Sequence, residues 1–220
     1  MLRIFAGYDE RESIGFAVFC HSLIARASQP LSIIPLSSSG LPEGSNSFTM
    51  SRFLVPYLCG FKGRAIFCDA SDMLVKADIA ELGCLFDDRF AVQVVKHAPY
   101  QTRHRTKYKG TSMECPNSTY LRKNWASVML FNCEHVAWSA YTPAYLRQAK
   151  PIDCLQLRNC ADHEIGELPD GWNRMVDEGQ PIEGARLMHW TAGIPAFDAY
   201  RDSPGAQEWH SERIKMKWVG

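Results

Sequence analysis

Two carboxylates follow a short apolar run in the first third of the chain. Residues 65–68 are all apolar, and Asp69 and Asp72 come shortly after them. Hard cations such as Mn²⁺ and Mg²⁺ prefer carboxylate oxygens as ligands, and a cation at that place can neutralise a diphosphate as it leaves. The same pair also fits a structural interpretation, in which Asp72 caps a turn and Asp69 accepts hydrogen bonds from backbone N–H groups.

The elements that would position these carboxylates follow from the apolar pattern. Strands and helices alternate through the first half of the chain, which predicts an α/β fold with a parallel sheet. Ligands of such sheets gather at the carboxyl ends of the strands, where Asp9 and Asp69 lie. No linker or repeat divides the sequence, so we expect one domain over residues 1–220. The expected strands are 2–6, 31–36, 65–68, 90–95, 128–131 and 187–190, and the expected helices are 13–27, 49–59, 78–86 and 134–148.

Composition narrows the class of protein. The 24 basic and 24 acidic side chains give a formal net charge of zero, which argues against a protein that coats nucleic acid. No uninterrupted apolar stretch of about 18 residues predicts a transmembrane helix. Charged residues from Asp9 onward argue against a signal peptide, so we expect a cytoplasmic protein. The eight cysteines form no C-x-x-C pair and are expected to be free, mostly buried side chains, with a structural zinc site as the alternative.

The pattern around the two carboxylates resembles nucleotide-sugar glycosyltransferases of the GT-A fold, in particular glycosyltransferase family 8 and related small bacterial glycosyltransferases. In that pattern an Arg and a Pro precede an apolar strand that ends in D-x-D. Here Arg52 and Pro56 precede residues 65–68, and the acidic motif is D-x-x-D. The resemblance implies a GT-A-like (Rossmann-like) α/β fold, with a mixed, mainly parallel sheet flanked by helices.

A second segment, residues 187–195, resembles the H-[FWY]-x-G-x-x-P segment of the same family. The resemblance implies that His189 joins Asp69 and Asp72 as a metal ligand and that Gly193 lies near the diphosphate. Mn²⁺ is favoured over Mg²⁺, because an imidazole beside two carboxylates shifts a site in that direction. Which of the two aspartates contacts the metal directly, and which the ribose, stays open.

The resemblance also assigns roles around the donor. The first strand end is implied to surround a uridine, with a strand-to-helix turn capped by Asp9 as the alternative. Arg52 and a lysine from residues 96–123 are the candidates for further phosphate contacts. Asp162, in the segment 162–164 that takes the place of the family's acidic D-Q segment, is the candidate polar group near the anomeric carbon. The candidate nucleoside-binding residues are Ala6, Gly7, Tyr8 and Asp9.

Residues 96–123, called the basic segment below, contain seven Lys and Arg residues and one acidic residue, Glu114. Three interpretations remain: a solvated loop, a lid over the diphosphate or a charged acceptor, and a nucleic-acid contact. Residues 209–220 end in a basic, Trp-containing stretch that includes Lys217 and Trp218. That stretch is either a solvated helix end or a peripheral contact with a membrane or a glycolipid acceptor.

Together with the acidic motif, the resemblance therefore implies a metal-dependent, hexosyl-transferring enzyme. Its expected donor is a UDP-sugar, and its acceptor is a glycan, a glycolipid or a protein. One alternative is a nucleotidyltransferase of similar fold, against which the acidic, Gly-poor residues 7–11 argue. The other is a nonenzymatic binding protein that uses the basic segment.

Overall fold

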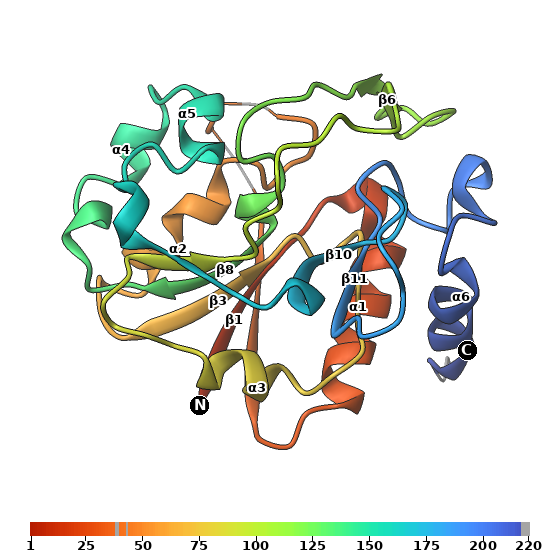
Figure 1. Ribbon diagram of the computed structural model, residues 1–220, viewed down its shortest axis with the longest axis horizontal. Coiled ribbons are helices and arrows are strands. Elements are labelled where there is room, and N and C mark those ends of the chain that lie inside the picture. The colour runs from red at the N-terminus through yellow and green to blue at the C-terminus, as the bar shows by residue number, and fades with distance from the viewer. Residues whose placement is uncertain (38–39, 43, 217–220) are drawn as a thin grey trace.

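The computed structural model describes residues 1–37, 40–42 and 44–216, and its centre is a six-stranded sheet (Figure 1). The strand order is β2-β1-β3-β8-β5-β9. Only β8 runs against its neighbours β3 and β5, whereas the β1–β2, β1–β3 and β5–β9 pairs are parallel. The strands are β1 (Leu2–Gly7), β2 (Leu31–Leu36), β3 (Arg64–Cys68), β5 (Val92–Val94), β8 (Val128–Asn132) and β9 (Ile165–Glu167). This mixed, mainly parallel sheet confirms the predicted fold class.

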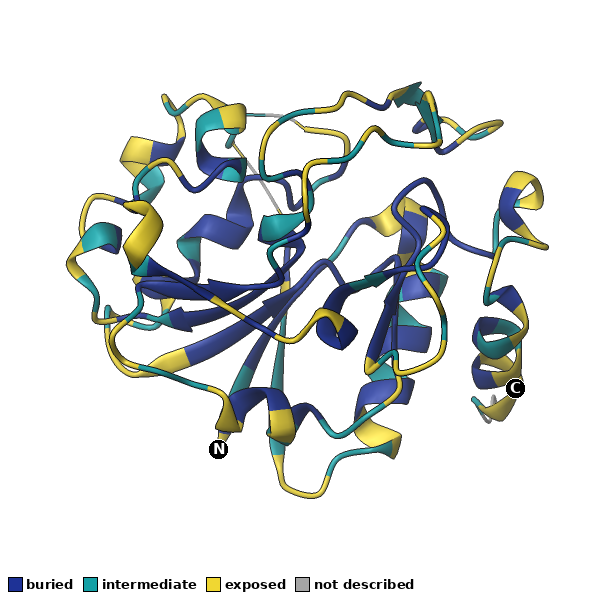
Figure 2. Ribbon diagram, in the orientation of Figure 1, coloured by how far each residue is buried: buried dark blue, intermediate teal, exposed yellow. Residues whose placement is uncertain are grey.

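Helices cover both faces of the sheet because its central strands are apolar on both sides. In β3, Ala65 and Phe67 point into one core, which α2 (Val55–Leu58), α4 (Pro143–Leu146) and α5 (Pro151–Leu155) enclose. Ile66 and Cys68 point into the other core, against α1 (Ser13–Ala25) and α3 (Ile79–Cys84). Figure 2 shows the result as a buried sheet between partly exposed layers.

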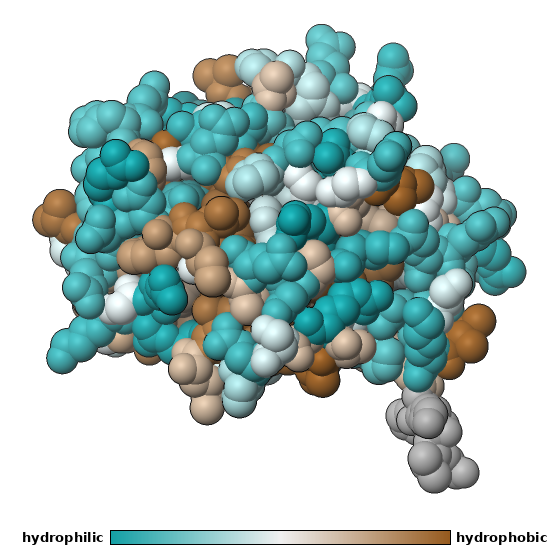
Figure 3. Space-filling view, turned by 60° about the horizontal axis from the view of Figure 1, so that its bottom comes forward, coloured by the Kyte–Doolittle hydropathy of each residue, from teal (hydrophilic) through white to brown (hydrophobic). Residues whose placement is uncertain are grey.

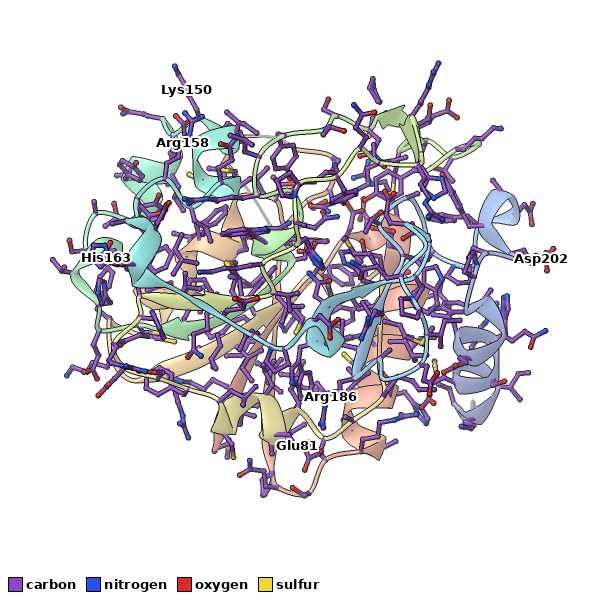
Figure 4. The ribbon with its side chains drawn as sticks, viewed as in Figure 1. Glu81, Lys150, Arg158, His163, Arg186 and Asp202 are labelled. Carbon is purple, nitrogen blue, oxygen red and sulfur yellow. The ribbon has the colours of Figure 1, made fainter. Side chains whose placement is uncertain are left out.

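A second sheet of three short strands stands beside α1. It consists of β10 (Arg174–Met175), β11 (Leu187–His189) and β4 (Met73–Val75), in that order. A third core joins this sheet to α1 and to α6 (Ala206–Lys215), with Trp190 and Trp209 completely buried in it. Arg186, just before β11, pairs with Glu81 of α3, and Figure 4 shows the two side chains close together.

Several predicted helices are shorter or broken. The expected helix 49–59 is a 3₁₀ helix, η2 (Ser51–Leu54), followed by α2, because Pro56 fits only the first turn of a new helix. The expected helix 134–148 is divided into η4 (Val136–Trp138) and α4, with Thr142 capping the first turn of α4. The basic segment carries one two-stranded ladder, β6 (Thr106–Lys107) and β7 (Cys115–Pro116).

All eight cysteines are free, but only four of them are buried, fewer than expected. Within the described ranges, no helix is long and apolar enough to cross a membrane. Hydrophilic residues cover most of the face seen in Figure 3, and the hydrophobic residues on it form separate patches. Lys217 and Trp218 of the predicted C-terminal contact lie outside the described residues.

Candidate active site

Asp69, Asp72 and His189 meet at the carboxyl end of β3. One ligand atom from each of the three side chains lies within 4.8 Å of the others, and all three residues are buried. The register of the small sheet produces this meeting. His189, the last residue of β11, pairs with Met73, the first residue of β4, and Asp72 comes immediately before β4. His189 Nε2 is 3.3 Å from Asp72 Oδ2.

The extra residue of the D-x-x-D motif is absorbed by a left-handed turn. Ala70 has φ +63°, a conformation that costs a residue with a Cβ atom roughly 1–2 kcal/mol. The turn is fixed by backbone hydrogen bonds from Ser71 N to Asp69 O (2.7 Å) and from Met73 N to Ala70 O (2.9 Å). It thereby brings both carboxylates to the same cluster.

Charge and burial give the cluster the character of a cation site. Burial raises the pKa of Asp69, and the Arg52 guanidinium only partly offsets that rise. Burial alone would also raise the pKa of Asp72, but His189 outweighs it and holds that pKa below its usual value. Burial likewise disfavours the His189 imidazolium, yet the Asp72 carboxylate brings the pKa of His189 above its usual value. Asp69 Oδ1 and Asp72 Oδ1 are buried and accept no hydrogen bond from any residue that the structure describes.

Arg52 forms a buried ion pair with Asp69. Its Nη1 lies 2.6 Å from Asp69 Oδ1, close enough for an ion pair although the angles do not make a hydrogen bond. The same Nη1 donates to Ala126 O (2.8 Å), and Nε donates to Thr49 O (3.0 Å). These contacts fix the guanidinium against the protein, so its geometry suits positioning Asp69.

The residues at the end of β1 lie beside the acidic turn, where Ser71 Oγ donates to Gly7 O (3.2 Å). Asp9 is completely buried, and its two oxygens already accept from Arg11 and Ser47. The Asp9 side chain thus caps the turn that leads into α1, which was the alternative to a direct contact with uridine. Gly7 lets the Phe48 ring approach, because a Cβ at that position would lie 2.5 Å from it. Ala6 is buried in the core, and Tyr8 contacts the Phe16 ring edge-on.

Two other predicted site residues have different surroundings. Gly193 follows β11 and allows a close approach by Tyr200, whose ring would lie 2.5 Å from an added Cβ.

Asp162 precedes β9, at the amino end of a strand that runs parallel to β3, so it lies at the opposite edge of the sheet from Asp69. Its carboxylate is 91% exposed and pairs with Arg122. In Figure 4 the adjacent His163 lies at the edge of the molecule, far from β11. The structure does not bring Asp162 to the cluster.

The basic segment lies over the cluster. Tyr108 is completely buried, and its backbone N–H donates to Ala192 O (2.7 Å), three residues beyond His189. Lys107 and Tyr120 line a cavity of only about 60 Å³ together with Arg52 and Asp69. The positive charge of Lys107 also helps to lower the pKa of Asp72, an effect that the sequence did not indicate.

Two further side chains at the site were missed from the sequence. Glu12 is completely buried, and neither of its carboxylate oxygens has a hydrogen-bond partner among the described residues. Burial and the nearby charge of Asp72 place its pKa well above the usual value. Asn173 is completely buried and contacts His189 directly. Neither residue stands out in the sequence from the other polar residues around it.

A second, larger cavity adjoins the cluster. It has a volume of about 320 Å³ and is lined by Lys96, His97, Tyr100 and Met175, among others. One lining residue, Met175, is the neighbour of the metal-ligand candidate His189 in the β10–β11 register. Burial, together with the charge of His189, lowers the pKa of His97 to about 4, and the imidazole is therefore neutral at pH 7.

Comparison with known proteins places the chain in a family. No family model matches it. Over 226 residues it is 35% identical to Protein CDI from Arabidopsis thaliana, an alignment that covers 96% of this chain and 85% of that protein. The chain belongs to the Protein CDI family.

The fold of this family member is similar to that of several solved glycosyltransferases. The galactosyltransferase LgtC, solved with donor and acceptor sugar analogues, matches with a TM-score of 0.66 at 13% identity, over 100% of this chain and 98% of that one. The bifunctional glycosyltransferase WbbM matches with a TM-score of 0.70 at 15% identity. GlyE from Streptococcus pneumoniae matches with a TM-score of 0.64 at 13% identity. The alignments cover 99% of this chain in both cases, but 50% of WbbM and 61% of GlyE. The Protein CDI family member therefore has the GT-A fold that the sequence resemblance implied.

Proposed function

We propose that the protein is a glycosyltransferase that moves a sugar from a nucleotide-diphosphate donor, with a UDP-sugar as the favoured donor. One observation carries the proposal: Asp69, Asp72 and His189 form a buried cluster at the carboxyl edge of a GT-A sheet. The fold likeness to LgtC, WbbM and GlyE supports it, since all three are glycosyltransferases. We further propose that residues 1–220 act as one catalytic unit.

The cluster fits a divalent cation. Its donor set of two carboxylates and one imidazole suits Mn²⁺, and the buried Asp72 Oδ1, which has no hydrogen-bond partner among the described residues, needs a positive partner. We propose that Asp69, Asp72 and His189 hold Mn²⁺ or Mg²⁺. When bound, the cation would offset the charge that develops on the departing nucleotide diphosphate.

The side chains around the cluster then have separate roles. Arg52, which lines the same cavity, holds the Asp69 carboxylate in place through their ion pair. Lys107, the lysine of the basic segment that lines the same cavity, is the proposed phosphate contact. The end of β1, residues 6–9, supplies the backbone beside which the nucleoside would lie. Asp9 shapes that strand end through its bonds to Arg11 and Ser47.

Donor entry requires the basic segment to move. The cavity above Asp69 holds about 60 Å³, whereas pockets for ligands of this size measure several hundred Å³. We propose that the basic segment opens to admit the donor and then closes over the diphosphate, which excludes water from the site. This is the lid interpretation of the sequence, now with Tyr108 as the residue that anchors the closed position.

We propose that the acceptor sugar binds in the cavity of about 320 Å³ next to the cluster. Tyr100 and Met175 offer apolar surface to a sugar ring, and Glu178 and Gln180 offer hydrogen-bonding groups. Because Met175 lies beside His189, an acceptor hydroxyl there would be close to the donor's reacting carbon. The acceptor itself would be a glycan, a glycolipid or a protein.

Thermal unfolding tests the donor site. UDP, GDP and ADP are each added with Mn²⁺ or with a chelator. A ligand at about a hundred times its Kd stabilises the folded state by roughly 2.7 kcal/mol, which raises Tm by about 5–10 °C in a chain of this length. We expect the shift for UDP with Mn²⁺ only. The variant D72N should lose it and keep the wild-type Tm range, and D198N, which changes an exposed carboxylate, should retain it.

Other outcomes decide against parts of the proposal. A purine-selective shift would overturn the UDP-sugar donor and favour a nucleotidyltransferase. An absence of any nucleotide shift would overturn the donor site altogether. If UDP and Mn²⁺ do stabilise the protein, hydrolysis and transfer assays with a panel of UDP-sugars and simple glycosides then identify the sugar and the acceptor.

A further inference from the structure

One buried amide connects His189 to the backbone beyond the basic segment. Asn173, the last residue of the 3₁₀ helix η6 (Asp170–Asn173), has no exposed surface. Its Oδ1 lies 2.9 Å from His189 Nδ1, and its Nδ2 donates to the carbonyl oxygen of Asn124 at 3.0 Å. Asn124 is the residue that follows the basic segment.

The orientation of this amide is determined by chemistry. The carbonyl oxygen of Asn124 can only accept a hydrogen bond, so the Asn173 atom that faces it must be the NH₂ group. The other end of the amide, Oδ1, can only accept, and it faces His189 Nδ1. His189 must therefore carry a proton on Nδ1, whatever the state of its other nitrogen.

The neighbouring contacts keep both ends of the bridge in place. Asn124 adopts a left-handed conformation (φ +62°), and its own side chain donates to Tyr100 Oη at 2.7 Å. Asn173 leads directly into β10, which pairs with β11 next to His189. Both partners of the amide are thus held by backbone structure, which leaves little freedom for the imidazole to rotate.

We propose that Asn173 is a positioning residue that holds His189 as the Nδ1–H tautomer and leaves Nε2 free to bind a cation together with Asp69 and Asp72. The inference rests on the metal site proposed above and adds the residue that prepares it. Without Asn173, the proton of a neutral His189 would be drawn to Nε2, where Asp72 Oδ2 accepts it at 3.3 Å. That proton would block the nitrogen that faces the cluster.

Nitrogen NMR of metal-free protein with ¹⁵N-labelled histidine tests the tautomer directly. Spectra are taken at a pH where His189 is neutral, and its signals are assigned with H189Q. We expect a protonated Nδ1 in the wild type and a protonated Nε2 in N173L. A wild-type His189 with its proton on Nε2 would overturn the proposal, and this measurement needs no metal site.

Calorimetric Mn²⁺ binding supplies a second readout. Loss of a partner that orients a metal-ligating histidine typically weakens metal binding by about 10–100-fold, which is the expectation for N173L. N132L is the matched control, because Asn132 also donates one and accepts one hydrogen bond but lies at the far end of β8. N173D keeps an acceptor for His189 Nδ1 and should bind Mn²⁺ more tightly than N173L.

The outcomes separate the two proposals. If N173L folds and binds Mn²⁺ as the wild type does, Asn173 has no positioning role. If N173L does not fold, the tautomer of His189 in the wild-type protein still decides. If wild-type protein shows the Nδ1–H tautomer but binds no Mn²⁺, the proposed metal site fails while the orientation of His189 by Asn173 stands.

Discussion

Arg52 Nη1 and Asp69 Oδ1 are 2.6 Å apart, and both side chains are almost completely buried, 5% and 10% exposed. The pair joins η2 to the turn that follows β3, and the guanidinium also lies over the Phe67 ring at 5.1 Å. A buried ion pair adds little net stability, because desolvation of both charges opposes their attraction. Removal of one partner is costly, since the other charge is then buried alone.

The first prediction concerns this pair. R52M should lower the free energy of unfolding by about 3–5 kcal/mol, because Asp69 would keep a buried, uncompensated carboxylate. At about 2–4 °C per kcal/mol, the loss in Tm is on the order of 10 °C. Chemical denaturation measures the change. The double variant R52M/D69N should be more stable than R52M, since it removes the stranded charge. Equal stability of the single and double variants would contradict the importance of the pair.

The second prediction concerns the contact between α1 and the acidic turn. Gly15 lies in α1, and a Cβ there would be 2.0 Å from the carbonyl oxygen of Ser71. Backbone cannot move aside as a flexible side chain can, so G15A should cost about 1–3 kcal/mol or displace the turn. A displaced turn would also weaken Mn²⁺ binding at Asp69 and Asp72. Denaturant unfolding and Mn²⁺ calorimetry measure the two effects.

The matched control for Gly15 is Gly83 in α3. A Cβ there would meet only the end of the flexible Leu2 side chain, at 3.2 Å. G83A should therefore be close to neutral, because the higher helix propensity of alanine offsets a small rearrangement. Similar losses in G15A and G83A would show that the close approach to Ser71 has no special effect.

The sequence predicted the parts of the fold that depend on local pattern. Mainly apolar runs predicted β1, β3 and β8, since a strand buried on both faces has no regular polar alternation. Thr142 and Pro143 divide the expected helix 134–148, because a proline inside a helix lacks an N–H and clashes with the preceding turn. The strands β4, β9 and β10 have only two or three residues, too few for a periodic signal.

The candidate site was predictable only where a motif is contiguous. Asp69 and Asp72 lie on one short turn, and His189 belongs to a recognisable segment. Asn173 and Glu12 became evident only from contacts made in three dimensions, because each ends a short 3₁₀ helix in which nothing distinguishes it from neighbouring polar residues. Asp162 was placed by order along the chain, but the direction of β9 puts it at the other edge of the sheet.

The third prediction concerns acid stability. Burial raises the pKa of Asp9, but its bonds to Arg11 and Ser47 outweigh burial and bring the pKa to about 2, below the ordinary 3.8. A carboxyl with a lowered folded-state pKa stabilises the protein fully above pH 4, and this contribution is lost as the pH falls toward 2. D9N should thus be less stable than the wild type by about 1–2 kcal/mol at pH 6, where the partial exposure of Arg11 reduces the effect.

Urea unfolding between pH 2 and pH 6 measures this difference. The gap between the wild type and D9N should narrow as the pH falls below 4 and become small near pH 2. Glu10 is an exposed acidic residue next to Asp9, and E10Q should follow the wild-type curve. A gap between D9N and the wild type that does not change with pH would show that the substitution acts through packing alone.

The last prediction concerns the basic segment. Lys107 lines the cavity above Asp69, so its ammonium group is placed to contact the diphosphate of a bound donor. A hydrogen bond to a charged group contributes about 1.5–3 kcal/mol, and K107M should therefore bind UDP at least about 10-fold more weakly while its weak affinity for uridine is unchanged. The salt dependence of UDP binding should also decrease, because one fixed positive charge is lost.

K109M is the control, since Lys109 lies in the same segment but lines a different cavity, with Arg105 and Asp198. Calorimetry with UDP and uridine, each with Mn²⁺, separates the cases. Equal losses for UDP and uridine in K107M would mean that the substitution disturbs the closed segment as a whole, whereas a loss confined to UDP would identify Lys107 as a phosphate ligand.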